Sequence, residues 1–372
     1  MKRSILRIIC FTSAFLIMSS CFEQEPIKIG FVSGLSGRRS ELGVSSRNSV
    51  HMAIEELNAN GGINGRSVQL IIKDNKSDPQ TNMRVITELV DEGVVAIIGP
   101  SMSQMAETTM AATDQKNVLV FSPTISTDEL SDKDDHFIRI MPAVSLQAIK
   151  TTEVILNDKI NSAAVVYDSS NQKYSEPIYL LFKKTFTEKG GIITYVDNLK
   201  EGRNRNLLNM ARKINKSSAE SLVLITSGID AAAICQQIRK LNKSIKFYGV
   251  YWTKTGSLVE RGGRSVEGMT IVAAYEAKPR SARYVQFFSD YRERYKIDPR
   301  FNSIFAYEAA LILIYGLKHS DKIDGESLKR TILNKSTFEG LEETLTLNRF
   351  GDVLRKDMAV VIENGKFKRK RE

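Results

Sequence analysis

Serine and threonine hydroxyls gather directly after three apolar runs of the sequence. The first run, "IKIGFVS", leads into "GLSG", the second, "VVAIIG", precedes Ser101 and Ser103, and the third, "VLVF", precedes Ser122, Thr124 and Ser126. Hydroxyls and free backbone N–H groups at helix N-termini bind a carboxylate without a full positive charge. The carboxyl ends of parallel strands are where open α/β sheets place their ligands. Each hydroxyl taken singly can equally be a helix cap or a turn residue, but three such loops together predict one shared anion site.

These loops lack the motifs of nucleotide, acyl-transfer and metal chemistry. The glycines of the first loop do not have the G-x-G-x-x-G spacing, and Arg38-Arg39 stands where a P-loop has its Lys-Ser or Lys-Thr. No G-x-S-x-G sequence marks a nucleophilic serine. The histidines are far apart and have no metal-ligand spacing: His51, His136 and His319. We therefore expect no cofactor, no metal and no catalytic activity, and only turnover of a bound compound would favour an enzyme.

The three loops need a parallel sheet to bring them together, and the chain alternates strands and helices in the way that builds one. Apolar strands at 27–32, 67–74, "VVAIIG" and "VLVF" are continuous aliphatic runs, which are typical of a parallel sheet covered on both faces. A second series begins with a helix at 145–159 and includes the strands "AAVVYD", "SLVLIT" and "KFYGVY". Longer helices at 281–295 and 304–318 follow. The expected fold class is α/β, with two doubly wound α/β lobes.

The first residues have the pattern of a targeting segment. Three basic residues precede an apolar run that is too short to span a membrane, and small residues lead into Cys21. This pattern predicts a signal peptide at 1–20 and resembles the lipobox of bacterial lipoproteins, in which the cysteine becomes the lipidated first residue. Residues 21–26 then form a tether, and Cys235 has no partner and is expected to be a core thiol. Ordinary secretion with Cys21 left as a free thiol is the alternative.

The formal net charge of +10 does not by itself indicate a nucleic-acid partner. The basic residues are scattered except in the C-terminal "GKFKRKRE", and no base-stacking aromatic residues lie among them. An exported protein rarely meets nucleic acid, so we exclude that partner. The basic tail predicts either a frayed, solvated terminus or a contact with anionic lipid head groups beside the lipid anchor.

Six segments of the chain together resemble one family: "IKIGFVSGLSG", "AIEELNANGGINGR", "DNKSDPQ", "VVAIIGPSMS", "VFSPTISTDEL" and "FIRIMPAVSLQA". They are similar to the leucine/isoleucine/valine-binding proteins of bacterial ABC importers, which are type I periplasmic solute-binding proteins. The resemblance implies two α/β lobes that are joined by three crossover segments and close over a small ligand. It assigns 27–143 plus 275–342 to lobe 1 and 144–274 plus 343–372 to lobe 2.

The resemblance also implies which residues bind the ligand. Residues that match Ser103, Ile125 and Ser126 hold the carboxylate of the amino acid in this family. An aromatic residue that matches Tyr174 closes over it. We expect the backbone at Ile125, rather than its side chain, to take part.

Several positions depart from the family pattern. The acidic residue that pairs with the ligand's ammonium group falls at Tyr251, and Asp230 in "SGID" could take its place, because a buried ammonium needs a counter-charge. An aromatic residue that lines the aliphatic pocket falls at Leu42, and Trp252 is expected to form another wall. Arg38 and Arg39 either lie exposed at the rim or favour a second acidic group on the ligand. Specificity for leucine is therefore not implied.

The predicted function is capture of a small carboxylate-bearing metabolite, an amino acid or a relative, at the cell envelope. Only a ligand that touches both lobes favours the closed state, and the closed form would be read by the permease subunits of an ABC importer. The protein would be anchored through Cys21 in the periplasm or on the outer cell-envelope surface. The alternative is a sensor subunit that presents its closed form to a membrane signalling receptor.

Overall fold

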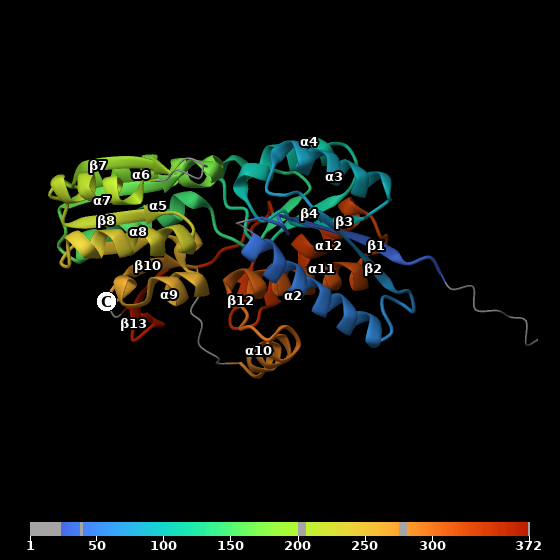
Figure 1. The fold of residues 1–372 in the computed structure, drawn as a ribbon. Helices are drawn as coiled ribbons and strands as arrows, with labels where there is room; N and C mark the ends of the chain where they lie inside the picture. The colour runs from blue at the N-terminus through green and yellow to red at the C-terminus, as the bar shows by residue number, and fades with distance from the viewer. Residues whose placement is uncertain (1–23, 38–39, 200–205, 275–280, 371–372) are drawn as a thin grey trace, which may run out of the picture.

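The computed structural model describes residues 24–37, 40–199, 206–274 and 281–370, which form two lobes side by side (Figure 1). The predicted signal peptide, the lipidation site Cys21 and the pair Arg38-Arg39 lie outside the described residues, as does the first half of the tether, 21–23. None of the helices in the described part of the chain is both long enough and apolar enough to cross a membrane.

Lobe 1, on the right in Figure 1, is built on a five-stranded parallel sheet. Its strand order is β2-β1-β3-β4-β5. Strands β1, β3, β4 and β5 are almost entirely buried, because helices cover both faces of the sheet, whereas the edge strand β2 is largely half-buried. The strand bounds are β1 Ile27–Ser33, β2 Val68–Asp74, β3 Ala96–Ile98, β4 Leu119–Ser122 and β5 Phe137–Arg139.

Helices from both ends of the chain cover this sheet. On one face α2 packs against α11 and α12, and on the other α3 packs against α4. Helix α3 starts after Asp78, because Asp78 accepts a hydrogen bond from the Thr81 N–H at 2.7 Å and Pro79 occupies the first turn. The helix bounds are α2 Ser40–Ala59, α3 Pro79–Asp91, α4 Ala106–Thr113, α10 Ala282–Tyr295, α11 Phe301–His319 and α12 Gly325–Lys335.

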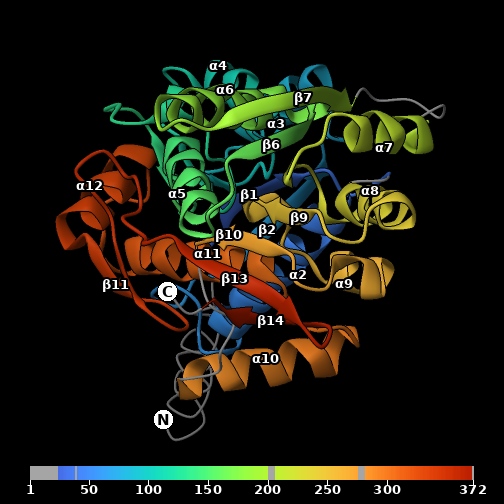
Figure 2. The same ribbon diagram turned by 90° about the vertical axis from the view of Figure 1, so that its left-hand side faces the viewer.

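Lobe 2 is built on a seven-stranded sheet with the order β14-β13-β10-β9-β8-β6-β7. Strands β6 to β10 are parallel, while β13 and β14 form an antiparallel hairpin at one edge. Figure 2 shows α5 on one side of this sheet and α7, α8 and α9 on the other. The strands are β6 Ser162–Asp168, β7 Ile192–Leu199, β8 Ser221–Ile225, β9 Lys246–Gly249, β10 Thr270–Ala273, β13 Met358–Glu363 and β14 Lys366–Arg369. The helices are α5 Val144–Asn157, α6 Gln172–Glu188, α7 Leu207–Lys216, α8 Gly228–Leu241 and α9 Gly256–Gly262.

The chain passes between the two sheets at three places. The first lies between β5 and α5, and the second includes residues 275–280, outside the described part. The third was expected after residue 342, but residues 343–355 stay with lobe 1. There Asp352 pairs with Arg139 of β5 at 2.7 Å, and the short strands β11 Thr337–Glu339 and β12 Thr344–Thr346 form a hairpin. The chain therefore crosses at 356–357, directly before β13.

The basic C-terminal segment is ordered, so the expectation of a frayed terminus is wrong for the residues described. Lys366 to Arg369 form β14, which pairs with β13 across an Asn364-Gly365 turn. Lys370 forms an ion pair with Asp158 at the end of α5. The segment is held because its backbone completes the edge of the sheet of lobe 2.

Candidate functional site

The three hydroxyl-bearing loops meet at the carboxyl ends of β1, β3 and β4, as the sequence predicts. Ser33 Oγ donates to Ser101 Oγ at 2.8 Å, and Thr124 Oγ1 donates to the Ser101 carbonyl at 2.7 Å. The Ser126 N–H donates to Ser103 Oγ at 3.1 Å. All five side chains are buried, so the hydroxyls form one connected layer at the end of the sheet that faces lobe 2.

The backbone of Ile125 is already engaged within this layer. Its N–H donates to Ser122 Oγ at 3.0 Å, and Ser122 Oγ in turn donates to the Pro100 carbonyl at 2.9 Å. The Ile125 side chain is fully buried against Ala106 and β4. A direct bond from the Ile125 N–H to a carboxylate would therefore replace an existing hydrogen bond, and its predicted role stays a prediction.

Gln147, on the first turns of α5, links the two aromatic residues of lobe 2 that the sequence singled out. Its Oε1 accepts from the Tyr174 hydroxyl at 2.8 Å and from the Tyr251 N–H at 3.3 Å. The Tyr174 hydroxyl also accepts from the Trp252 N–H at 3.3 Å, and the two rings meet edge to face at 5.7 Å. Burial raises the pKa of Tyr174, so its hydroxyl stays protonated and serves as a hydrogen-bond donor.

Two small cavities lie between the lobes, and Leu42 and Trp252 border both. The cavity volumes are about 30 Å³ and about 20 Å³. A volume of roughly 10–15 Å³ accommodates one water molecule, so a larger ligand requires the lobes to separate or side chains to shift. The first cavity is lined by Glu41, Leu42, Met102, Ser227, Gly228, Ile229, Asp230, Trp252 and Thr255, and the second by Leu42, Ser101, Thr124, Met141, Asn171, Tyr174, Tyr251, Trp252 and Phe301.

The structure thus brings five of the predicted ligand-binding residues to the cavities between the lobes: Leu42, Asp230, Tyr174, Tyr251 and Trp252. Asp230 lies in the first turn of α8, where its carboxylate accepts from Ser227 Oγ at 2.9 Å. Ser103, Ile125 and Ser126 do not border these two cavities, although they lie in the same loops as Ser101 and Thr124.

Three buried polar groups near this junction make no hydrogen bond within the described part of the chain. They are Ser126 Oγ, Gln147 Nε2 and the Tyr251 hydroxyl. The assignment of the Gln147 amide is fixed, because the Tyr251 N–H can only donate and therefore faces Oε1. A buried donor without an acceptor costs about 1–3 kcal/mol, which an acidic guest would recover.

Direct contacts hold the lobes together on both sides of the cavities. On one side the Gln104 N–H of lobe 1 donates to Asn171 Oδ1 of lobe 2 at 3.0 Å, and Lys173 Nζ lies 2.6 Å from Glu129 Oε1. On the other side Ser257 Oγ of α9 donates to Glu41 Oε2 of α2 at 2.8 Å. The structure therefore shows the two lobes closed on each other.

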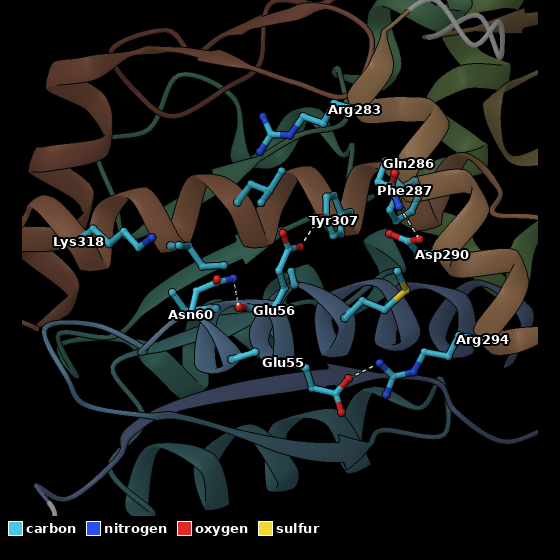
Figure 3. Close-up of a pocket in the computed structure, with 16 residues that line it drawn as sticks. Glu55, Glu56, Asn60, Arg283, Gln286, Phe287, Asp290, Arg294, Tyr307 and Lys318 are labelled. Carbon is cyan, nitrogen blue, oxygen red and sulfur yellow. Dashed lines mark hydrogen bonds and ion pairs between the residues drawn. The ribbon is translucent and has the colours of Figure 1, made fainter.

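A larger cavity, of about 530 Å³, lies in lobe 1 between α2, α10 and α11 (Figure 3). Two of its carboxylates have partners within the cavity wall: Glu55 pairs with Arg294, and Glu56 accepts from the Tyr307 hydroxyl at 2.9 Å. The lining comes from the half of α2 that points away from lobe 2, so this cavity is separate from the strand ends where the hydroxyls meet. Within the described residues no cluster of histidine, cysteine and acidic side chains could hold a metal ion.

Comparison with known proteins decides the family. The family model described as "Periplasmic binding protein" matches residues 26–362. The chain belongs to this family. Proteins of the periplasmic binding protein family work outside the cytoplasm, and the two-lobed α/β fold predicted from the sequence is confirmed by solved structures of the same architecture.

Individual relatives are distant but cover nearly the whole chain. A leucine-, isoleucine-, valine-, threonine- and alanine-binding protein of Pseudomonas aeruginosa is 23% identical over 90% of this chain and 89% of its own length. Among solved structures, a branched-chain amino acid transporter substrate-binding protein of Streptococcus pneumoniae, in complex with isoleucine, has a TM-score of 0.84 at 21% identity and covers 92% of this chain and 98% of its own. A solute-binding protein of an ABC transporter from R. palustris, in complex with benzoate, has a TM-score of 0.81 at 18% identity and covers 92% and 95%.

Sequence reasoning missed Gln147, which links Tyr174 and Tyr251 within lobe 2. It also missed Asn171 and Glu41, which form hydrogen bonds between the lobes. Gln147 left a signal in the sequence, because it stands between Val144 and Thr151 on the apolar face of α5, where a buried amide needs partners. Asn171 and Glu41 left none, since a polar residue at a helix start is usually a cap.

Proposed function

We propose that this chain captures a small carboxylate-bearing solute between its lobes and delivers it to an ABC importer. The observation that carries the proposal is the set of three buried groups without partners: Ser126 Oγ, Gln147 Nε2 and the Tyr251 hydroxyl. Each can donate to an anionic oxygen. They belong to both lobes, so a guest that accepts from all three favours the closed arrangement.

The residues that border the cavities between the lobes indicate which groups the ligand carries besides its carboxylate. The cavities between the lobes are bordered by Leu42, Met102, Met141, Trp252 and Phe301, which offer apolar and aromatic surface to a hydrocarbon group. Asp230 is the acidic side chain of lobe 2 that borders them, and it would receive an ammonium group. Relatives are named for branched-chain amino acids, and a solved structure of the same fold contains benzoate. These ligands all combine a carboxylate with a hydrocarbon group, as proposed here.

Attachment to the membrane through a lipid on Cys21 completes the proposal. The support is the sequence pattern before Cys21 and the closeness of Ile27, the first residue of β1, which leaves a short tether between anchor and lobe 1. Palmitate labelling of cells that express the protein, compared with cells that express Cys21→Ser, tests the anchor separately from ligand binding.

A thermal-shift screen of the purified protein tests the ligand class. The panel contains L-leucine, L-isoleucine, benzoate, 4-hydroxybenzoate and succinate. A compound at about 100 times its dissociation constant adds about 2.7 kcal/mol to the free energy of unfolding, which raises the melting temperature.

Two isosteric variants locate the response. Tyr251→Phe removes a hydroxyl without a partner at the lobe junction and should reduce the ligand-induced shift. Tyr315→Phe removes a hydroxyl from a ring of α11 that stacks on His319 and does not border the cavities. This variant should leave the ligand-induced shift unchanged. If no compound raises the melting temperature, or if both variants respond alike, the proposed site is wrong.

A further inference from the structure

Asp357 stands at the point where the chain passes from lobe 1 to lobe 2 for the last time. Two residues before it, Arg355 is anchored in lobe 1 by a buried ion pair with Glu308 of α11. One residue after it, Met358 begins β13 and pairs with Ala273 of β10 in lobe 2. Any change in the angle between the lobes must alter the backbone between these two anchors, so Asp357 lies at a hinge.

Asp357 is half-buried, and one oxygen of its carboxyl is enclosed in the closed structure. Its Oδ1 is buried and makes no hydrogen bond within the described residues. Burial is the main cause that raises the pKa of Asp357, to about 7. The negative charge of Glu153 also raises this pKa, and the positive charge of Lys150 lowers it. Lys150 and Glu153 both lie on α5, and their side chains pair with each other at 3.2 Å, so neither is dedicated to Asp357.

The charge of Asp357 also acts on one residue of the candidate site. Its negative charge is one of the causes that raise the pKa of Tyr174 on α6, whose hydroxyl binds Gln147. The charged and titratable groups around Asp357 are therefore Lys150 and Glu153 of α5 and Tyr174 of α6. The exposed Lys356 adjoins it on its own segment.

We propose that Asp357 takes up a proton when the lobes close, so that the closed form is favoured in mildly acidic surroundings and weakened in alkaline ones. The inference rests on lobe closure as described under the proposed function. When the lobes separate, water reaches the hinge and the carboxyl returns to its ordinary, lower pKa. The closed form then binds more protons than the open form over the whole interval between the two values, and closure becomes stronger as the pH falls through it.

The size of the effect follows from the same linkage. With a pKa of about 7 in the closed form and an ordinary carboxyl in the open form, the closure constant should be about tenfold higher at pH 6 than at pH 8. An anionic ligand adds to this in the same direction, because an ionised Asp357 near Tyr174 repels a bound carboxylate.

The protein carries its own reporter of closure. Trp252 is the single tryptophan of the sequence, it borders both cavities between the lobes, and it is 7% exposed in the closed structure. Opening would expose its indole to water and shift its emission to longer wavelength. No ligand is needed for this measurement, so its outcome is independent of whether the proposed ligand class is right.

The test records Trp252 fluorescence of the purified, ligand-free protein between pH 5 and 9, together with the radius of gyration from small-angle X-ray scattering. The wild type should show one transition towards a more open form as the pH rises, with a midpoint between the ordinary value of a carboxyl and about pH 7. Asp357→Asn, which keeps the neutral shape at every pH, should remain closed throughout. Asp114→Asn removes an exposed carboxyl after α4 and should behave as the wild type.

Two results would overturn the inference: a wild type without a transition in this range, or a transition that persists unchanged in Asp357→Asn. Far-ultraviolet circular dichroism confirms that each variant is folded. If Asp357→Asn does not fold, Asp357→Ser gives the same comparison with a smaller neutral side chain.

Discussion

Ser122 ends β4 and Ser126 lies four residues later in the loop that follows, yet only the replacement of Ser122 by alanine should lower stability. Ser122 Oγ accepts from the Ile125 N–H at 3.0 Å and donates to the Pro100 carbonyl at 2.9 Å. Ser126 Oγ is fully buried and makes no hydrogen bond within the described part of the chain. The same deletion of one oxygen thus removes two hydrogen bonds at one position and none at the other.

The magnitudes follow from these contacts. Ser122→Ala leaves a backbone donor and a backbone acceptor buried without partners, which should lower the free energy of unfolding by about 1–3 kcal/mol. Ser126→Ala removes a hydroxyl whose desolvation is uncompensated, so the unliganded protein should be equally stable or up to about 1 kcal/mol more stable. Urea denaturation of the two variants beside the wild type measures both effects.

Ligand binding should be impaired by Ser126→Ala, the variant that does not lower the stability of the unliganded protein. A hydrogen bond to a charged acceptor contributes about 1.5–3 kcal/mol, so Ser126→Ala should raise the dissociation constant roughly 10- to 150-fold. At a ligand concentration that stabilises the wild type by about 2.7 kcal/mol, a 30-fold weaker variant gains only about 0.9 kcal/mol.

The assay is the thermal shift of each variant with and without L-isoleucine or benzoate, whichever stabilises the wild type. The reasoning is refuted if Ser126→Ala destabilises the unliganded protein by as much as Ser122→Ala does, because Oγ would then have a partner. It is equally refuted if the ligand-induced shift survives in Ser126→Ala.

Three further outcomes test the packing. Glu308→Leu strands the buried guanidinium of Arg355 and should cost about 3–5 kcal/mol in urea denaturation, most of which the double variant with Arg355→Met should recover; equal loss in both would contradict a buried ion pair. Iodoacetamide should leave Cys235 unmodified in the native protein, because the thiol is buried and burial raises its pKa, and should alkylate it in urea. Peptide mass spectrometry maps the modification, and labelling of the native protein would show that α8 opens readily. Gly43→Ala places a Cβ 2.2 Å from the Gly34 carbonyl oxygen and should lower the urea midpoint by an amount equivalent to about 1–3 kcal/mol, an expectation that an unchanged midpoint would exclude.

The main elements of the fold were predictable because their signals are local. Continuous aliphatic runs identified the parallel strands, and the Asp78-Pro79 pair fixed the start of α3. The first turns of α2 were not identified, since Ser40 to Ser46 show no apolar periodicity. They are helical because Asn302, far away in the sequence, donates to the Leu42 carbonyl at 2.7 Å and to Ser45 Oγ at 2.6 Å.

Elements that depend on distant partners were missed. Strand β5 is three residues long and pairs with β4 on one side and through a single bridge with Asp352 on the other, and β11 and β12 are equally short. Helix α12 carries a signal that was available, because Asp324 accepts from the Ser327 N–H at 2.9 Å as an N-cap. The misplaced third crossing has the same origin, since the contact between Arg139 and Asp352 that keeps this segment in lobe 1 is not visible in local sequence.

The location of the candidate site was predictable from the sequence, but its hydrogen-bond network was not. Strand ends carrying hydroxyls converge in any parallel sheet, so the meeting of Ser33, Ser101 and Thr124 follows from topology. Which donor each hydroxyl serves depends on distances of a few tenths of an ångström, which sequence does not encode. The engaged N–H of Ile125 and the central amide of Gln147 are results of that kind.

The threading of the chain has a consequence for how this molecule reaches its native state. Helix α2 packs on α11, and the hydrogen bond from Ser46 to the Asn302 carbonyl joins residues 256 positions apart. Lobe 2 likewise acquires its edge hairpin only from the last residues described. Neither half can be completed from a contiguous fragment, so deletion of β13 and β14 or of α11 should damage the lobe concerned, and assembly must await the synthesis of these elements. Contacts this distant along the polypeptide make for slow folding and a long exposure of the unpaired surfaces of α2.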